Sequence, residues 1–187
     1  MDRATTPRGR RTAAFLTLMS TVAALPGAAC AVAWGSGPSA SALGPIGLAP
    51  DGTVAAVVLS DVDGDTVHVR VGERDEPVRF IGVNTPEVDW YGGRGGCYGP
   101  TSALYTRHRL LGRTVRLVFD SRLRDMYGRL LAYVYVRGEL FNLTLVRMGY
   151  ATADPVPPDT RMAGAFAAAQ SAARAAGRGV WTACSAG

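Results

Sequence analysis

Residues 53–83 read TVAAVVLSDVDGDTVHVRVGERDEPVRFIGV, and this stretch decides the fold. Its three runs TVAAVVLS, TVHVRV and PVRFIGV are rich in β-branched residues, which favour strands because they pack well on a pleated surface. Tight reversals are expected between the runs, at Asp63-Gly64 and at residues 72–76. We therefore expect a meander of three antiparallel strands.

Downstream of this stretch the pattern predicts both helices and strands. Two further strands are expected, TVRLVFD and RLLAYVYV, together with three helices. The expected ranges are 114–120 and 129–136 for the strands, and 100–111, 141–148 and 160–176 for the helices. Five short strands with a helix after the third predict an α+β fold, a five-stranded oligonucleotide-binding (OB-type) β-barrel with three α-helices.

Length and composition favour one domain with an N-terminal extension. A chain of 187 residues is about one domain long, and its 48% hydrophobic content is enough to bury a core, which we place in residues 51–187. The formal net charge is +5, but the first eleven residues contain four arginines and one aspartate. The rest of the chain is only slightly basic, so its charge says little about binding partners.

The N-terminal region is typical of an export signal. Residues 1–11 are positively charged, and residues 12–34 carry no charge and are mostly apolar, with Ala-Val-Ala at 31–33 as a small-residue cleavage site. We interpret residues 1–33 as a signal peptide and expect a secreted, extracellular protein. The alternative is an uncleaved, membrane-tethering anchor, because about 20 apolar residues span a bilayer. Residues 34–50 are rich in Gly, Ser, Pro and Ala and indicate a flexible linker.

Two cysteines remain if the chain is cleaved after Ala33. An even pair of thiols in an exported protein indicates a disulfide, which would join Cys97 and Cys184. The alternative is two independent buried cysteines.

Oxygen-bearing side chains gather in two turn-like segments. Asp63 and Asp65 lie in the first, and Asn84, Thr85 and Glu87 lie in the second. Hard cations such as Ca²⁺ prefer oxygen ligands of this kind. The alternative for the string DGDT is a plain hairpin turn, because Asp-Gly is favoured there.

Two arginines and a glutamate complete a set suited to phosphate chemistry. Arg79 and Arg129 are expected at the edges of strands of the same barrel, and a guanidinium can hold a phosphate with two hydrogen bonds and stabilise charge in the transition state. Glu87 follows Thr85-Pro86 and could act as a general base on water. These residues predict cleavage of a phosphodiester.

Five strings occur in the order and spacing of the staphylococcal nuclease (thermonuclease) family. They are DGDT, VRFIGVNTPE with its arginine eight residues before its glutamate, YGP, DMYGRLLAYVY and N-x-x-LVRxGYA. The chain resembles this family over about residues 54–181. The resemblance implies an exported, Ca²⁺-dependent endonuclease on an OB-type barrel that hydrolyses DNA and RNA and leaves 3′-phosphates. It implies no obligate protein partner, and we expect a monomer.

The resemblance also implies a role for each site residue. One Ca²⁺ per site would be held by Asp65, Asn84 and the backbone carbonyl of Thr85. The substrate and the attacking water would be handled by residues matching the family pattern: Glu87 on the water, Arg79 and Arg129 on the phosphate, and Tyr127 on a terminal phosphate.

Three departures from the family pattern bear on function. Asn84 stands where the family usually has a second calcium-binding aspartate, so metal affinity should fall. Met126 replaces a basic residue often seen before the tyrosine, and residues 151–160 lack the tyrosines that stack on the base. Base stacking is worth about 1 to 3 kcal/mol per base, so affinity or base preference should differ. The alternative function is a catalytically weakened module that only binds nucleic acid or protein.

Overall fold

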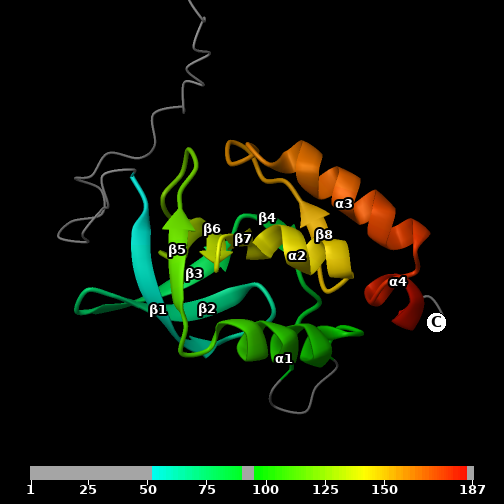
Figure 1. The fold of residues 1–187 in the computed structure, drawn as a ribbon, viewed down its shortest axis with the longest axis horizontal. Coiled ribbons are helices and arrows are strands. Elements are labelled where there is room, and N and C mark those ends of the chain that lie inside the picture. The colour runs from blue at the N-terminus through cyan, green and yellow to red at the C-terminus, as the bar shows by residue number, and fades with distance from the viewer. Residues whose placement is uncertain (1–51, 90–94, 185–187) are drawn as a thin grey trace, which may run out of the picture. The chain divides into compact units, whose positions relative to one another are not determined.

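Eight strands and four helices follow one another in residues 52–89 and 95–184, the part of the chain that the computed structural model describes (Figure 1). In chain order they are β1 (Val54–Asp61), β2 (Thr66–Val71), β3 (Arg74–Phe80), β4 (Gly82–Asn84), α1 (Gly99–Leu110), β5 (Thr114–Val118), β6 (Leu130–Val136), β7 (Glu139–Leu140), α2 (Phe141–Met148), β8 (Thr152–Asp154), α3 (Ala163–Ala175) and α4 (Val180–Ala183). The predicted signal segment 1–33 and linker 34–50 lie outside the described residues.

Five of the strands close into the predicted OB-type barrel. They are hydrogen-bonded in the order β3-β2-β1-β5-β6, and β3 also pairs with β6 to close the barrel. The closing pair is parallel, with Val78 opposite Leu130 and Arg79 opposite Leu131. Closure therefore places the end of β3, which carries Arg79, beside the start of β6, which follows Arg129.

The core follows from the alternation of side chains along the strands. In β1, Val54, Ala56 and Val58 are buried while Ala55 and Val57 are exposed, as expected when successive side chains point to opposite faces. Burying each valine or leucine stabilises the fold by about 1.5 to 3 kcal/mol. The barrel interior is therefore fixed by the periodicity that is visible in the sequence.

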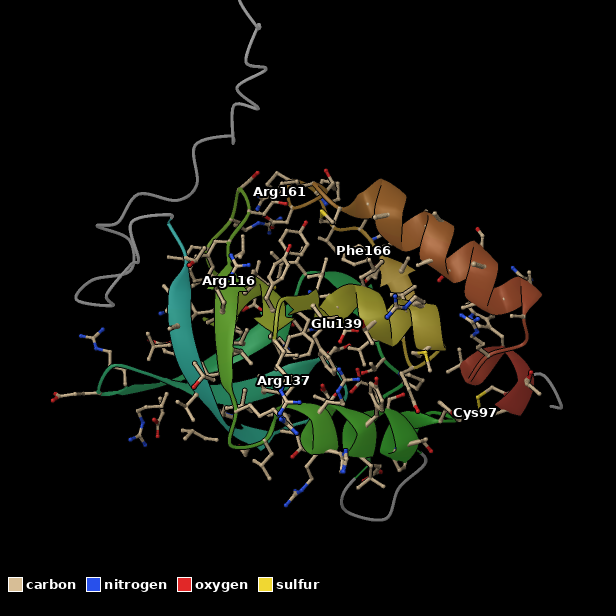
Figure 2. All side chains as sticks on the ribbon, in the orientation of Figure 1. Cys97, Arg116, Arg137, Glu139, Arg161 and Phe166 are labelled. Atoms are coloured by element: carbon tan, nitrogen blue, oxygen red, sulfur yellow. A yellow bond between two sulfur atoms is a disulfide. The ribbon has the colours of Figure 1, made fainter. Side chains whose placement is uncertain are left out.

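Two buried contacts attach helices to the barrel near the end of β3. In α2, the fully buried Asn142 accepts a hydrogen bond from the Val134 amide (2.8 Å) and donates one to the Ile81 carbonyl (2.9 Å). In α3, Phe166 faces the barrel (Figure 2) and contacts Gly82, whose φ of +77° and lack of a Cβ permit this approach. These contacts fix the turn between β3 and β4.

The structure corrects several details of the prediction. The expected strand 77–83 is divided, because the chain turns at Gly82, and β3 begins three residues earlier, at Arg74. β4 instead pairs with β8, and Asn84 lies opposite Thr152. The three predicted helices are present, but β7, β8 and α4 were not expected. Elements of two to four residues are too short to show a hydrophobic period.

Within residues 52–89 and 95–184, none of the helices combines the length and apolar character that crossing a bilayer requires.

Candidate active site

Asp65 is the buried carboxylate at the centre of the candidate site. The preceding turn is closed by a hydrogen bond from the Asp65 amide to Oδ1 of Asp63 (2.9 Å). The Asp65 side chain then accepts hydrogen bonds from the amide (2.6 Å) and the hydroxyl (3.1 Å) of Thr85. From α1, the Thr106 hydroxyl donates to the Gly64 carbonyl (2.6 Å) and fixes the turn from behind. The DGDT string is therefore both a tight turn and the anchor of the segment that follows β4.

The pKa of Asp65 is raised from the ordinary aspartate value of 3.8 to about 6. Burial is the largest cause, and the neighbouring Asp63 adds to it; the opposing influences are the Arg79 charge and the hydrogen bonds from Thr85. Removing a carboxylate from water disfavours its charged form unless a cation compensates. The site therefore favours positive charge next to Asp65.

Arg79 supplies positive charge at this place. Its Nη1 lies 3.1 Å from Oδ1 of Asp65, and its Nη2 donates to Oδ1 of Asn84 (3.1 Å). Nη1 also donates to the carbonyls of Phe80 (3.0 Å) and Val83 (2.8 Å). The side chain is only 16% exposed. Arg79 therefore bridges two of the three predicted metal ligands.

The donor set fits a hard cation in kind but is weak in charge. Asp65, Asn84 and the Thr85 carbonyl offer oxygen atoms only, which suits Ca²⁺. Within the described residues, no group of three or more His, Cys, Asp or Glu side chains could hold a metal ion. A cation at this place would have one buried carboxylate as its main ligand and would share it with Arg79.

Glu87 has a fixed backbone and an exposed carboxylate. Its carbonyl accepts a hydrogen bond from the Gly96 amide (2.9 Å), and Gly99 approaches the same carbonyl so closely that no Cβ would fit. The side chain is exposed, and none of the described residues forms a hydrogen bond or ion pair with its carboxylate. The carboxylate can therefore bind water or substrate without first breaking a contact within the described structure.

Arg129 is oriented by an aspartate that the sequence analysis did not single out. Its Nε donates to Oδ2 of Asp125 (2.7 Å), and the amides of Arg129 (3.0 Å) and Tyr127 (2.9 Å) donate to Oδ1. Burial alone would raise the pKa of Asp125, but these hydrogen bonds and the Arg129 charge hold it below its usual value. The i, i+4 spacing of Asp125 and Arg129 was the only signal for this pair in the sequence.

A cavity of about 320 Å³ connects the two arginines. Arg79, Arg129 and Tyr127 line it, and Met126 and Val156 are among the apolar residues that surround them. Tyr127 is 75% exposed and lies under the guanidinium carbon of Arg129, which is 5.5 Å from the ring centroid. Arg79 therefore belongs to two groups, the Asp65 cluster on one side and the cavity on the other.

The structure thus brings most of the predicted residues together, although not into one pocket. Asp65, Asn84 and Thr85 meet at Arg79, while Arg129 and Tyr127 meet Arg79 at the cavity. None of Asp65, Asn84, Thr85 and Glu87 lines the cavity itself. Glu87 is joined to the Asp65 cluster through the chain, two residues after Thr85.

The cavity has a second wall that the sequence analysis missed. Arg122 lines it and is held by Asp159, which is buried and accepts a hydrogen bond from the Arg122 amide (2.7 Å). Both residues lie in irregular segments, so no period in the sequence marks them.

The predicted disulfide is present between Cys97 and Cys184, whose Cα atoms are 5.8 Å apart. It joins the segment before α1 to the end of α4, and the alternative of two independent cysteines is wrong for this structure.

Comparison with known proteins yields one family. The model described as "Staphylococcal nuclease homologue" matches residues 77–183. The thermonuclease of Staphylococcus intermedius is 39% identical over 100 residues, which are 54% of this chain and 60% of that protein. The thermonuclease of Staphylococcus hyicus is 33% identical over 125 residues, 67% of this chain and 74% of that protein. The endonuclease YncB of Bacillus subtilis is 32% identical over 123 residues, 65% of this chain and 58% of that protein.

Proposed function

The chain belongs to the staphylococcal nuclease family, and on that premise we propose that it is a Ca²⁺-dependent endonuclease that hydrolyses phosphodiester bonds in DNA and RNA and leaves 3′-phosphates. The observation that carries the proposal is that Arg79 takes part in both halves of the site. It contacts the oxygen donors Asp65 and Asn84 and also lines the cavity that contains Arg129. A phosphate in the cavity could therefore be reached from both arginines.

Arg129 is suited to hold a phosphate because only part of its guanidinium is used. Nε is occupied by Asp125, and no described residue is hydrogen-bonded to its two terminal nitrogens. These nitrogens can donate two parallel hydrogen bonds to phosphate oxygens and stabilise charge that develops in the transition state. The Tyr127 hydroxyl, on the exposed ring beside Arg129, would bind a neighbouring phosphate.

Glu87 is the proposed general base. A base must be able to reach the water that it deprotonates. The exposed Glu87 carboxylate meets this condition, and its backbone is held in place by Gly96. Its charge would also orient the water for attack on phosphorus.

Asp65, Asn84 and the Thr85 carbonyl would hold the Ca²⁺. When bound, the ion would act as a Lewis acid that polarises a phosphoryl oxygen. The raised pKa of Asp65 and the nearby Asp63 support a cation here, because both disfavour an uncompensated negative charge.

We also propose that the protein is exported and acts outside the cell as a monomer. The charged and then apolar N-terminal sequence supports export, and the disulfide supports an oxidising compartment. A membrane-anchored form, with residues 1–33 retained, is the alternative.

The experiment is incubation of the purified protein with high-molecular-weight DNA and with RNA, in Ca²⁺ and in chelator. We expect Ca²⁺-dependent fragmentation and products that accept a 5′ label but resist 3′ extension until a phosphatase is added. Glu87→Gln and Arg129→Ala should each lower turnover by at least about two orders of magnitude.

Asn84 favours the second candidate, a module that binds nucleic acid without cutting it, because the site lacks the charge that a second aspartate would supply. Retention of DNA in a binding assay, with no cleavage in any divalent cation, would support that candidate and overturn the first.

A further inference from the structure

The backbone of Glu87 rests on a short segment rich in glycine, residues 95–99. The Gly96 amide donates to the Glu87 carbonyl, and a Cβ at Gly96 would lie only 2.9 Å from Cβ of Pro86. Gly99 lies against the same carbonyl. Because no described residue holds the Glu87 carboxylate, its position depends on this backbone contact.

The disulfide ties that segment to the C-terminal helix. Cys97 follows Gly96 directly and is bonded to Cys184, which caps α4. Figure 2 shows the labelled Cys97 beside the start of α1, close to α4. Cys97 is exposed, so the bond acts mainly as a tether and adds little buried apolar surface.

The far end of the tether is itself anchored. The Val180 amide, at the start of α4, donates to the Gly149 carbonyl at the end of α2 (2.9 Å). The Arg178 side chain donates to the Arg147 carbonyl (3.0 Å). A continuous path of contacts therefore runs from α2 through α4 and the disulfide to the carbonyl of Glu87.

The other partners of this region hold α1 instead. Tyr98 stacks on Tyr150 with ring centroids 5.8 Å apart, and the Ser102 hydroxyl donates to the Tyr150 carbonyl (2.7 Å). Both contacts lie after Cys97 in the chain. They would keep α1 in place if the disulfide were absent, and α1 reaches Gly96 through the hydrogen bond from the Gly99 amide to the Gly96 carbonyl (2.9 Å).

We propose that the disulfide between Cys97 and Cys184 is a positioning element for Glu87, so that turnover depends on it while binding of Ca²⁺ and substrate does not. The inference rests on the proposed role of Glu87 as general base. The ligands around Asp65 and the arginines at the cavity are held by their own hydrogen bonds, none of which involves residues 95–99. Loss of the tether should therefore displace Glu87 alone.

The test compares the wild type with the double variant Cys97→Ser/Cys184→Ser, well below its unfolding temperature. We expect kcat to fall about tenfold, since small errors in position cost much of the rate, with KM for DNA and the Kd for Ca²⁺ unchanged. Loss of the disulfide also lowers stability, because it frees the unfolded chain from a long closed loop. The matched control is Leu117→Ala, at a fully buried position in β5, which also lowers stability and should leave kcat unchanged.

A double-mutant cycle with Glu87→Gln separates positioning from a general structural effect. In the Glu87→Gln background, removing both cysteines should cause no further fall in kcat. An unchanged kcat in the double variant, a fall shared by Leu117→Ala, or a further fall in the Glu87→Gln background would overturn the proposal.

Hydrogen exchange tests whether the disulfide holds the Gly96 backbone in place, and it requires no measurement of activity. The Gly96 amide should exchange faster in the cysteine-free variant and at the wild-type rate in Leu117→Ala. Unchanged exchange in the cysteine-free variant overturns the inference, whatever the enzyme does. Full turnover by Glu87→Gln would instead overturn the assigned role of Glu87, and with it the catalytic half of the inference.

Discussion

The guanidinium of Arg79 lies 3.1 Å from the carboxylate of Asp65. The residue proposed to hold the phosphate is thus the ion-pair partner of the residue proposed to hold the metal. This relationship follows from the β2–β3 hairpin, in which Thr66 lies opposite Arg79. A cation that binds Asp65 must share the carboxylate with Arg79 or displace the Arg79 side chain toward the cavity.

Replacing Arg79 with Gln should change two properties in opposite directions. Turnover should fall by about two orders of magnitude because a phosphate donor is lost. Calcium binding without substrate should become several-fold tighter, because a positive charge no longer competes for Asp65. Arg79→Lys is the matched control, since it keeps the charge but not the planar fork, and it should leave the Kd close to that of the wild type. Calorimetric titration measures the Kd for Ca²⁺ of both variants. Weaker calcium binding by Arg79→Gln than by the wild type would contradict the argument.

Asn84→Asp should restore a negative charge at the site. The Asn84 oxygen already contacts Arg79, so the new carboxylate would lie within the same cluster as Asp65. Added negative charge attracts a divalent cation, and we expect the Kd for Ca²⁺ to fall about tenfold or more. Asn84→Ala is the control and should bind no better than the wild type. Equal or weaker affinity in Asn84→Asp would mean that the new carboxylate pairs with Arg79 alone.

Calcium affinity should depend on pH through Asp65. Its pKa is raised to about 6, so the folded chain keeps this proton at pH values where an unfolded chain has lost it. Below pH 6 a proton competes with Ca²⁺, and affinity should fall roughly tenfold per pH unit, while above about pH 7 it should be level. Without metal, the same shift makes Asp65 favour folding at low pH, and this contribution is lost as the pH rises through 6. Titrations between pH 5 and pH 8 measure the first effect, and a flat profile would exclude Asp65 as the main ligand.

Asp125→Asn tests the orientation of Arg129. The change keeps the side-chain shape but weakens the contact with the Arg129 Nε. We expect kcat to fall about ten- to a hundredfold through misplacement of the guanidinium. Because Asp125 acts through Arg129, the same change in an Arg129→Ala background should have little further effect on kcat. A full additional fall in that background would show an independent role.

The sequence was sufficient for the barrel and for one half of the site. Alternating valines marked β1 and β2, and the Asp63-Gly64 turn between them placed Asp65 opposite the end of β3. Once these strands pair, the meeting of Asp65 and Arg79 follows from register alone.

The other half depends on contacts that local patterns do not encode. Arg129 reaches the cavity because β3 and β6 pair in parallel across 52 residues of chain, Val78 with Leu130. The same is true of Arg122, whose partner Asp159 is 37 residues away. Such pairings join segments far apart in the chain, so Arg122 and the separate two-stranded sheet of β4 and β8 were missed, whereas Asp125 was missed although it lies only four residues from Arg129.

The buried amide of Asn142 has a practical consequence for production of the protein. Asn142, Leu143 and Thr144 form the acceptor sequence for N-linked sugars, yet the Asn142 nitrogen donates to the Ile81 and Ala132 carbonyls and is fully enclosed. An oligosaccharide attached during synthesis in a eukaryotic secretory host would prevent α2 from docking against β6. Folded protein from such a host should therefore carry no sugar at Asn142. A bacterial host avoids the loss of protein that is glycosylated at Asn142 and cannot fold.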